Sequence, residues 1–564
     1  MPQRLVTRFE SSGGVESSRY AETMQYFARL AHASPHAKLF TFGLSPQGRE
    51  IRCLVAASGG ELTPEAARAS GKAVVLIQNA IHAGEVEGKD ASMLLLREIL
   101  VTRERASLLD NLILLVIPIL NVDGHERISA FNRPNQNGPK EMGWRTNALN
   151  LNLNRDYLKA DAPEMKALLA LFSSWLPDFY IDNHCTDGAD YQYHVTYDIE
   201  TRQSIWPGLG AFAARGMMPE VLAAVERDGF LVGPYVEMLD GDLHHGIADM
   251  PSYPRLSTGY AATQNRLCLL VEAHALKPYE NRVHSTMSMN IAVLQYLSAH
   301  HAQLRRLNDE ADRETVREHS VQKIPFPVGF TESPAHEPLR FKGYRTTEEL
   351  SPVTGSSITR YTTDPEETVI PFHRWLQTTR EVVVPDAYVI PRELGFITDL
   401  LKLHGVSFGH LEESRRCEVE RYRFSGTRFA SYPYEGRHLA ELDIEGYAEV
   451  VTIPAGAAIV PTAQRAMRVI VNLLEPAAPD SLARWGFFSA FVERKEYAEP
   501  YVMEPIARRM MEEDADLRAE FHRRLADDES FRQNPSERLD FFYRRSVYFD
   551  ECENVYPVMR LTRL

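Results

Sequence analysis

The sequence contains little cysteine. Its 564 residues include five cysteines, which are scattered and form no CxxC pair. This pattern argues against a cysteine-based zinc site and a dense disulfide framework, and it favours a reducing compartment. The longest strongly apolar run, residues 112–120, is too short to span a bilayer and has the length of a buried strand. The first residues lack an apolar core of signal-peptide length, so we expect a soluble cytoplasmic protein without a membrane partner, with secretion as the alternative.

Basic residues are too few for a general nucleic-acid-binding surface. The chain has 77 acidic and 62 basic residues, a formal net charge of −15. Because nucleic-acid binding needs a basic surface, we expect no nucleic-acid partner. The net charge says little about a small substrate, since a local cleft can carry the opposite sign. With 44% apolar residues the chain can form ordinary cores, and its length predicts two to four domains.

Short apolar segments alternate with helical patterns in the first 300 residues. Strand patterns occupy residues 74–77, 113–119, 179–181 and 267–271, and helical patterns occupy residues 20–31, 90–100, 162–175 and 286–304. Strands that are apolar throughout must be covered on both faces, which is the arrangement of an α/β fold. We therefore predict a central sheet with helices on both faces.

A second region follows a change of composition. Residues 305–323 are dense in charge, several prolines follow closely, and no long Gly/Ser linker separates the two regions. We predict a first domain over residues 1–315 and a smaller α+β domain over residues 320–564, with a helical C-terminal end and a fixed docking position. Residues 382–403 and 450–474 share a strand–strand–helix pattern and form a candidate internal repeat.

A histidine and a glutamate lie three residues apart between a predicted strand and a predicted helix. His82 and Glu85 follow the strand at residues 74–77 and precede the helix that starts near residue 90. A hydrolytic zinc site uses nitrogen and oxygen ligands and leaves one position open for water. The spacing alone is weak evidence, because two later pairs share it and are interpreted as ordinary surface residues. These pairs are His410 with Glu413 and His438 with Glu441.

Two further polar residues follow apolar strands. His184 lies just after the strand at residues 179–181, and functional groups of α/β sheets gather at the carboxyl ends of strands. We interpret it as the third metal ligand; the alternative is a histidine that only caps the strand. Glu272 ends the next apolar run, where a carboxylate is seldom buried without a partner. It either faces a metal-bound water or pairs with Arg266 or Arg282.

Six motifs occur in one order between about residues 20 and 300. They are His82-Ala83-Gly84-Glu85, Asn121-Val122-Asp123-Gly124, Trp144-Arg145, Asn154-Arg155, His184 and Glu272. In order and approximate spacing they resemble the zinc metallocarboxypeptidases, the carboxypeptidase A-like family. The resemblance implies a carboxypeptidase-like α/β/α fold with a mixed central sheet. It also implies one Zn²⁺ per chain, held by His82, Glu85 and His184.

The resemblance implies roles for the remaining motif residues. Glu272 matches the general base, which takes a proton from the attacking water and passes it to the leaving amine. Arg145 matches the arginine that polarises the scissile carbonyl. Asn154 and Arg155 match the pair that binds the terminal carboxylate of the substrate, and the planar guanidinium suits two-pronged binding of a carboxylate.

The family pattern differs from this sequence at one position and does not identify a residue at another. Where the family usually has an aspartate that orients a zinc-binding histidine, this chain has Asn152. An amide in place of that carboxylate is expected to make His82 a weaker ligand. The tyrosine that closes over the substrate is either Tyr253 or Tyr260, both of which precede Glu272, and we favour Tyr253.

The motifs together predict a zinc-dependent carboxypeptidase that acts on peptides with a free C-terminus. One alternative keeps the zinc but makes the chain an amide hydrolase of acylated amino acids or cell-wall peptides; such forms often lose the carboxylate clamp, which Asn154 and Arg155 supply here. A non-catalytic binding module is a third hypothesis, but it should lack a ligand or the base. Side-chain preference stays open, although Arg255 would suit an acidic side chain if it pointed inward. We expect the second domain to shape access to the cleft without supplying catalytic groups.

Overall fold

An eight-stranded mixed sheet forms the centre of the N-terminal region. The computed structural model describes residues 5–186 and 188–563. The strand order is β1-β2-β4-β3-β5-β9-β6-β7. The strands are β1 (Ala37–Leu44), β2 (Glu50–Ala56), β3 (Ala73–Asn79), β4 (Leu112–Ile117), β5 (Phe179–Thr186), β6 (Val195–Ile199), β7 (Val232–Pro234) and β9 (Leu267–His274). β3 pairs in parallel with β4 and β5, and β5 pairs in parallel with β9, whereas β2–β4 and β6–β9 are antiparallel, so the predicted mixed sheet is confirmed.

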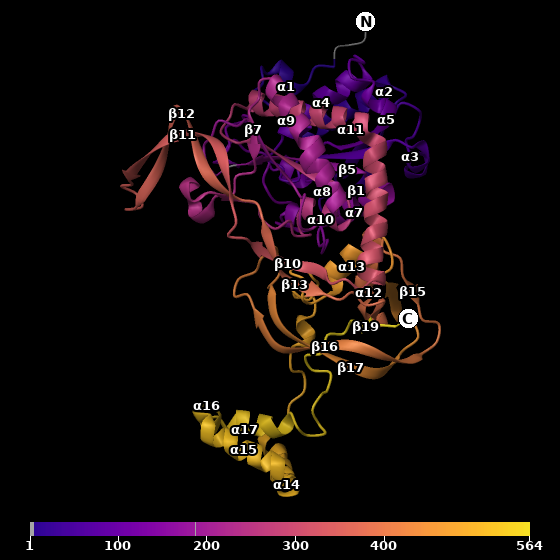
Figure 1. Cartoon of the computed structure of the whole chain (residues 1–564), viewed down its shortest axis with the longest axis vertical. Coiled ribbons are helices and arrows are strands. Elements are labelled where there is room, and N and C mark those ends of the chain that lie inside the picture. The colour runs from indigo at the N-terminus through magenta and orange to yellow at the C-terminus, as the bar shows by residue number, and fades with distance from the viewer. Residues whose placement is uncertain (1–4, 187, 564) are drawn as a thin grey trace.

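Helices cover both faces of this sheet (Figure 1). They include α2 (Tyr20–Ala33), α4 (Glu87–Leu100), α7 (Pro163–Trp175), α9 (Met218–Arg227), α10 (Ser257–Thr263) and α11 (Tyr279–Thr315). Successive residues of a strand point to opposite faces. In β3, Val74 and Leu76 pack in the core that contains α7, while Val75 and Ile77 pack in the core that contains α4 and α11. This confirms the predicted α/β/α layering and explains why the strands are apolar throughout.

The charged stretch after residue 305 is helical. α11 continues to Thr315, and a π-helical turn, η5 (Val316–Val321), follows directly. The long helix leads from the first region into the second (Figure 1). The change of composition therefore marks the exit of a helix rather than a loop, and the domain limits at residues 315 and 320 stay a prediction.

A six-stranded sheet lies in the C-terminal region, with the order β15-β18-β14-β19-β16-β17. Its strands are β14 (Ala387–Ile390), β15 (Gly409–His410), β16 (Arg415–Phe429), β17 (Ala440–Ile453), β18 (Ala458–Pro461) and β19 (Met559–Leu561). The two candidate repeat segments meet here, because β14 and β18 pair antiparallel and lead to α12 (Gly395–Leu403) and α13 (Met467–Leu474). The combination of strands and helices confirms the predicted α+β class of this region.

The two regions share one hydrophobic core. Phe172 of α7 and Tyr260 of α10 belong to the same buried cluster as Ile397 and Leu401 of α12. The hydroxyl of Tyr260 also lies 3.0 Å from Nδ1 of His404, and both side chains are fully buried. The second region is therefore packed against the first rather than tethered to it, in agreement with the missing Gly/Ser linker.

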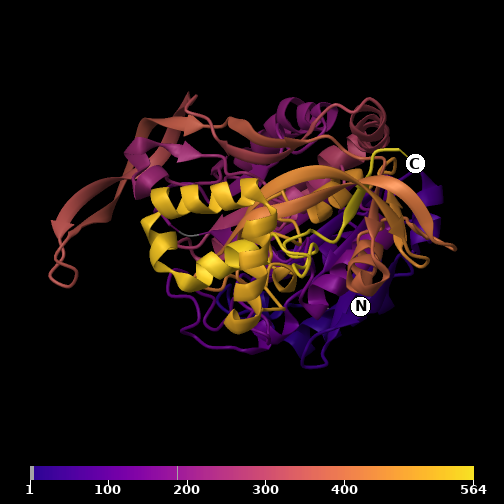
Figure 2. The same cartoon turned by 90° about the horizontal axis from the view of Figure 1, so that it is seen from below.

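Two parts of the C-terminal region project from this body (Figures 1 and 2). One is a hairpin of β11 (Glu337–Leu350) and β12 (Ser357–His373), whose base pairs with β8 (Ile247–Ala248) of the first region. The other is the helical cluster of α14 (Pro500–Glu513), α15 (Ala515–Asp527), α16 (Glu529–Gln533) and α17 (Pro535–Tyr543). Its own core contains Phe521, Phe531, Phe541 and Phe542. Within residues 5–186 and 188–563, no helix is both long and apolar enough to cross a membrane.

Candidate metal centre and active site

The connection between β3 and α4 carries His82 and Glu85 at the carboxyl end of the sheet. β3 ends at Asn79 and α4 begins at Glu87, so both residues lie in this connection. It passes close to a second loop at Gly84, where a Cβ would lie only 2.7 Å from the main-chain O of Gly143. A larger residue at Gly84 would push apart two segments that both lead to functional side chains.

Strands β5 and β9 supply the other groups. His184 and Glu272 occupy paired positions on these neighbouring parallel strands. Asp182 lies two residues before His184 and therefore on the same face of β5. All three side chains are buried. Because the carboxyl ends of parallel strands meet at one edge of a sheet, these groups lie beside the connection that carries His82.

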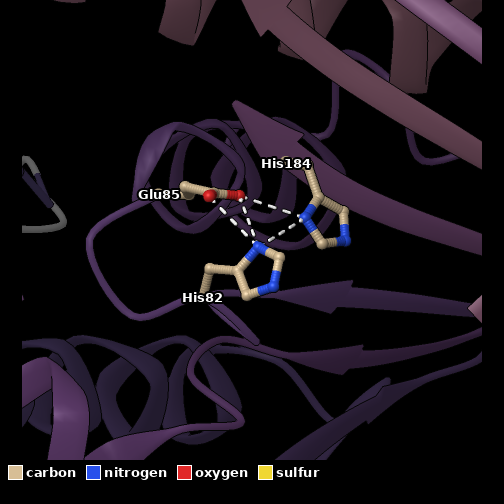
Figure 3. A group of neighbouring side chains, drawn as sticks. All are labelled: His82, Glu85 and His184. Atoms are coloured by element: carbon tan, nitrogen blue, oxygen red, sulfur yellow. Dashed lines mark hydrogen bonds and ion pairs between the residues drawn. The ribbon is translucent and has the colours of Figure 1, made fainter. Parts of the chain in front are cut away.

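Three potential ligand atoms converge at this edge (Figure 3). Nδ1 of His184 lies 3.2 Å from Nδ1 of His82 and 3.0 Å from Oε2 of Glu85, and Nδ1 of His82 lies 3.2 Å from the same oxygen. This is the one group of three potential ligands with such geometry in the described part of the chain. Two imidazole lone pairs and a carboxylate that face one another repel unless a cation or a proton lies between them. Two nitrogens and one oxygen form the donor set of a catalytic zinc site, so these residues fit Zn²⁺.

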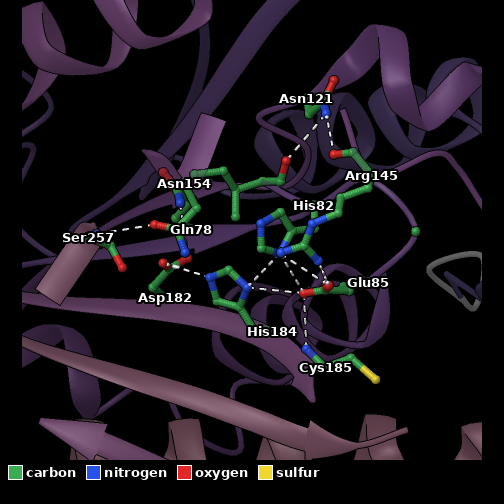
Figure 4. A network of polar contacts seen from close by, with 12 residues as sticks. Gln78, His82, Glu85, Asn121, Arg145, Asn154, Asp182, His184, Cys185 and Ser257 are labelled. Atoms are coloured by element: carbon green, nitrogen blue, oxygen red, sulfur yellow. Dashed lines mark hydrogen bonds and ion pairs between the residues drawn. The ribbon is translucent and has the colours of Figure 1, made fainter. Parts of the chain in front are cut away.

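Each histidine forms a hydrogen bond through the ring nitrogen that points away from the ligand cluster; Figure 4 shows the bond between His184 and Asp182. Nε2 of His184 donates to Oδ2 of Asp182 at 2.8 Å, and Nε2 of His82 donates to Oδ1 of Asn152 at 3.0 Å. The orientation of the Asn152 amide is fixed by a second donor, the N–H of Asn154, which requires an oxygen at that position. With protons on Nε2, both Nδ1 atoms are free to bind a metal. Asn152 thus occupies the orienting position, while the weaker binding expected of His82 stays a prediction.

Burial and neighbouring charges set the protonation of the cluster. Burial lowers the pKa of His82 to about 4. Burial alone would raise the pKa of Glu85, but His82 and Arg133 hold it well below its usual range; Nη2 of Arg133 lies 2.7 Å from Oε1 of Glu85. Burial opposes protonation of His184, yet the charge of Asp182 raises its pKa well above the ordinary value. The low pKa keeps Glu85 ionised, as a metal ligand must be, and a dication bound at Nδ1 of His184 would take the place of a proton there.

Glu272 lies beside the cluster without a hydrogen-bond partner for one of its oxygens. Among the described residues, Oε2 of Glu272 accepts no hydrogen bond. Burial raises the pKa of Glu272 to about 8; the charges of Glu85 and Asp182 add to this rise, and His184 opposes it. A buried carboxyl group with a raised pKa next to metal ligands is a common arrangement for an acid–base group.

The alternative ion-pair role of Glu272 is contradicted by the geometry. Arg266 pairs with Asp312, with Nη2 and Oδ2 3.1 Å apart. Arg282 pairs with Glu87, with Nε and Oε1 3.0 Å apart. Both arginines that could have neutralised Glu272 are therefore engaged with other carboxylates.

Arg145 lies at the solvent side of the cluster. Its Nη1 is 3.5 Å from Oε1 of Glu85, and its side chain is 42% exposed. The motif residues around it hold its backbone: the side-chain amide of Asn121 donates to the carbonyl of Arg145 at 3.2 Å. Trp144 is fixed by the guanidinium of Arg127, which lies 4.5 Å from the ring centre. A partly exposed cation next to the ligand atoms can reach a bound substrate. That Arg145 polarises the scissile carbonyl stays a prediction.

Asn154 and Arg155 lie next to Asn152 and are held by residues from elsewhere in the chain. Asn154 is buried, and its Oδ1 accepts the N–H of Ser257 at 3.2 Å, which leaves its amide NH₂ to donate. Nη1 of Arg155 donates to the carbonyl of Asn154 at 2.7 Å, and its Nε donates to the hydroxyl of Tyr434 at 3.1 Å. The second nitrogen of the fork, Nη2, makes no hydrogen bond among the described residues.

The two candidate closing tyrosines have different environments. Tyr260 is fully buried and bonded to His404 and Gln264, so it cannot move over a substrate without breaking the shared core. The hydroxyl of Tyr253 donates to the carbonyl of Phe330 at 3.2 Å. The role of Tyr253 in substrate binding stays a prediction.

The C-terminal region reaches the site through the loop between β16 and β17. Oε2 of Glu435 accepts the backbone N–H of Asn152 at 2.8 Å. Arg437 forms a two-pronged pair with Asp161, with both distances 2.7 Å. Arg255, which could have favoured an acidic substrate, is instead paired with the buried Asp480 of the same region at 2.6 Å.

Asp182 and Arg133 are functional candidates that the sequence did not reveal. Asp182 could have been found, because its position two residues before His184 on a strand predicts the same face. Arg133 lies in an irregular loop, and no sequence pattern relates it to Glu85. The interpretation of the two later His-x-x-Glu pairs as surface residues agrees with the structure, since His410 and His438 are exposed and bonded only to main-chain carbonyls among the described residues.

Residues 23–204 match the family model described as zinc carboxypeptidase. The match includes the three candidate metal ligands and ends before Tyr253 and Glu272. It confirms the resemblance drawn from the sequence, and together with the ligand cluster it confirms the predicted zinc cofactor. No curated protein matches the chain in sequence.

Solved structures of metallo-carboxypeptidases are similar to about half of this chain. The enzyme from Pseudomonas aeruginosa, in complex with (2-guanidinoethylmercapto)succinic acid, has 19% identity, covers 51% of this chain and 70% of its own, and has a TM-score of 0.39. The metallo-carboxypeptidase from Burkholderia cenocepacia has 17% identity, covers 50% of this chain and 69% of its own, and has a TM-score of 0.36. Carboxypeptidase A from Helicoverpa armigera has 17% identity, covers 50% of this chain and 74% of its own, and has a TM-score of 0.37.

Proposed function

We propose that this chain removes C-terminal residues from peptides with a free carboxylate. Its match to the zinc carboxypeptidases over residues 23–204 supports its assignment as a zinc metallopeptidase. The observation that carries the proposal is the convergence of Nδ1 of His82, Nδ1 of His184 and Oε2 of Glu85 beside the unpaired carboxyl group of Glu272. A ligand set and an acid–base group that lie side by side are the minimum a hydrolytic zinc site requires.

His82, Glu85 and His184 hold the metal in this proposal, and Asp182 and Asn152 orient the two histidines. When bound, Zn²⁺ supplies a Lewis acid and lowers the pKa of its water toward ~7. Glu272 takes the proton from the attacking water at its carboxylate and later gives it to the leaving amine. Burial raises the pKa of Glu272 toward that of the attacking water, so proton transfer to and from its carboxylate is close to balanced in free energy.

Arg145, Asn154 and Arg155 position the substrate in this proposal. Arg145 lies at the open side of the ligand cluster and donates to the carbonyl oxygen as negative charge develops on it. The free nitrogen of the Arg155 guanidinium and the amide NH₂ of Asn154 donate to the terminal carboxylate of the peptide. Tyr253 would complete the site only after releasing the carbonyl of Phe330.

The proposal is tested with purified, zinc-loaded protein and a set of short peptides. We expect stepwise release of single residues from the C-terminus, detected by mass spectrometry, and loss of this release after chelation and its return with Zn²⁺. Matched peptides with an amidated C-terminus should be cleaved far more slowly. Hydrolysis of N-acylated amino acids or cell-wall peptides, with no release from ordinary peptides, would instead support the amide-hydrolase alternative.

A further inference from the structure

One buried arginine differs from the others in its charge environment. Four arginines of the described chain are more than nine-tenths buried: Arg266, Arg282, Arg468 and Arg560. Three of them pair with carboxylates, namely Arg266 with Asp312, Arg282 with Glu87, and Arg560 with Glu420 and Glu475. Arg468 has no carboxylate within ion-pair distance among the described residues. A buried charge without a counter-ion is costly, so the difference needs an explanation.

The contacts of Arg468 are all with neutral groups. Its Nη1 donates to the carbonyl of Ser204 at 2.6 Å, and its Nε donates to the hydroxyl of Thr315 at 3.3 Å. The guanidinium carbon lies 5.5 Å from the ring centre of Phe326. Burial lowers the pKa of Arg468 to about 10, whereas the paired Arg560 has a raised pKa. These contacts orient the guanidinium but do not neutralise it.

Arg468 faces a cavity of about 190 Å³ between the two regions. The cavity is lined by the segment that contains Ser204 and Trp206, by Ser252 and Tyr253, and by α13. A single water needs roughly 10–15 Å³ of such volume, so the cavity can hold a small organic molecule.

The lining of the cavity combines positive charge with apolar walls. Two arginines, Arg202 and Arg468, lie on it, and its one acidic residue, Glu318, is paired with Arg317 at 3.4 Å. Apolar walls come from Trp206, Phe326, Val328 and Phe330, and uncharged polar groups come from Ser252, Thr263 and Asn472. A cationic group set among apolar walls selects an anion that carries an apolar body.

We infer that this cavity binds a small organic carboxylate, whose negative charge lies against the guanidinium of Arg468. A carboxylate matches the planar fork of the arginine and supplies a counter-ion at ion-pair distance, where the described residues place none; Glu318, Glu200 and Asp312 act on Arg468 only from farther away. The ligand would contact α13 of the second region and the Ser252–Tyr253 segment of the first. That segment leads to Ser257, whose N–H holds Asn154, so the ligand would stiffen the loop beside the active site. The inference does not depend on the proposed peptidase activity.

The test measures binding to the full-length protein without using activity. Isothermal titration calorimetry and thermal unfolding are carried out with sodium isovalerate, with sodium phosphate and with sodium chloride of matched ionic strength. We expect saturable binding of isovalerate and a concentration-dependent rise of the unfolding temperature, because a ligand of the folded state alone stabilises it. Arg468→Met should raise the Kd for isovalerate at least tenfold. Arg465→Met is the control, because Arg465 is a neighbouring arginine that bonds to Gln264 and does not line the cavity.

Three results would overturn the inference: no binding of isovalerate, equal binding in Arg468→Met, or saturable binding of phosphate alone. If Arg468→Met does not fold, a crystal structure of the wild-type protein with isovalerate decides the question. A carboxylate on the Arg468 guanidinium supports the inference, and isovalerate bound only elsewhere overturns it.

Discussion

The Nδ1 atoms of His82 and His184 lie 3.2 Å apart, and each ring is held in that orientation by a different acceptor on its Nε2. His184 donates to a carboxylate, Asp182, whereas His82 donates to an amide, Asn152. The two histidines therefore present the same ring atom to the metal site with unequal support. This asymmetry allows the contribution of each supporting residue to be measured separately.

Asp182→Asn should weaken zinc binding by ~10–100-fold. The amide can present its NH₂ group to Nε2 of His184, which would move the ring proton to Nδ1, the atom that must face the metal. Asn152→Asp should have the opposite effect, because a carboxylate accepts more strongly from Nε2 of His82. Competition with a chromogenic chelator measures both affinities, and circular dichroism checks the fold. Unchanged zinc affinity in both variants would mean that these hydrogen bonds do not control the ligands.

Glu272→Gln should keep the fold and the zinc but reduce turnover by ~10²–10⁴, since only the proton-transfer group is lost. Glu280→Gln, which changes an exposed glutamate, is the control and should leave turnover unchanged. The measurement is kcat on a short peptide together with zinc content by metal analysis. Activity of Glu272→Gln within about threefold of wild type would show that another group acts as base.

The sequence predicted the parts of the site that depend on strand ends. His82, His184 and Glu272 each follow an apolar run, and parallel pairing of β3, β5 and β9 brings these ends together. Local patterns were sufficient here because fully apolar strands can only be buried in a covered sheet.

Contacts between distant segments could not be predicted in the same way. Arg133 reaches Glu85 from an irregular loop, and Glu435 reaches Asn152 across 283 positions of sequence. Neither contact produces a periodic pattern in the chain. The buried position of Tyr260 depends likewise on the packing of a second region, which no local signal describes.

Arg155→Ala should reduce kcat/KM on peptides with a free C-terminus by ~10–100-fold, the usual loss for a hydrogen bond to a charged group. Amidated peptides serve as the built-in control, because they lack the carboxylate and should be affected little. Arg155→Lys should recover part of the activity, since it keeps the charge but loses the fork. Equal losses on free and amidated peptides would indicate that Arg155 supports the fold rather than the substrate.

Tyr434→Phe should raise KM for peptides by about threefold or more, with kcat and zinc content nearly unchanged. The reason is that Arg155 loses one of the two hydrogen bonds that orient it. The loss of such a hydrogen bond costs ~0.5–1.5 kcal/mol. Tyr432→Phe is the matched control, since Tyr432 lies in the same loop and is 82% exposed. A large fall in kcat with zinc retained would mean that the second region supplies a catalytic group. A truncation near residue 320 is a poorer test, because it would uncover the core shared through Phe172 and Tyr260.

Asp198→Asn should stabilise the protein at pH 8 and have little effect near pH 4. Burial, and then the charge of Asp249, raises the pKa of Asp198 to about 7 from 3.8. The folded chain therefore keeps this proton up to about pH 7, whereas the unfolded chain loses it near pH 4. Since the folded state binds more protons in this window, stability falls as pH rises from about 4 to 7 and the loss is complete above pH 7.

Asparagine removes that loss because it carries no charge next to Asp249. A tenfold difference in proton affinity between the folded and unfolded chains corresponds to about 1.4 kcal/mol in the free energy of unfolding. Asp198 is partly exposed, and solvent reduces the effect of its charge. We therefore expect the free energy of unfolding to rise by roughly 1–2 kcal/mol at pH 8. Thermal unfolding of wild type and variant between pH 4 and pH 8 measures the difference. Asp364→Asn, at an exposed position of β12, is the control and should give no pH-dependent gain. A gain that is equal at pH 4 and pH 8, or a loss at pH 8, would contradict the role of charge repulsion between Asp198 and Asp249.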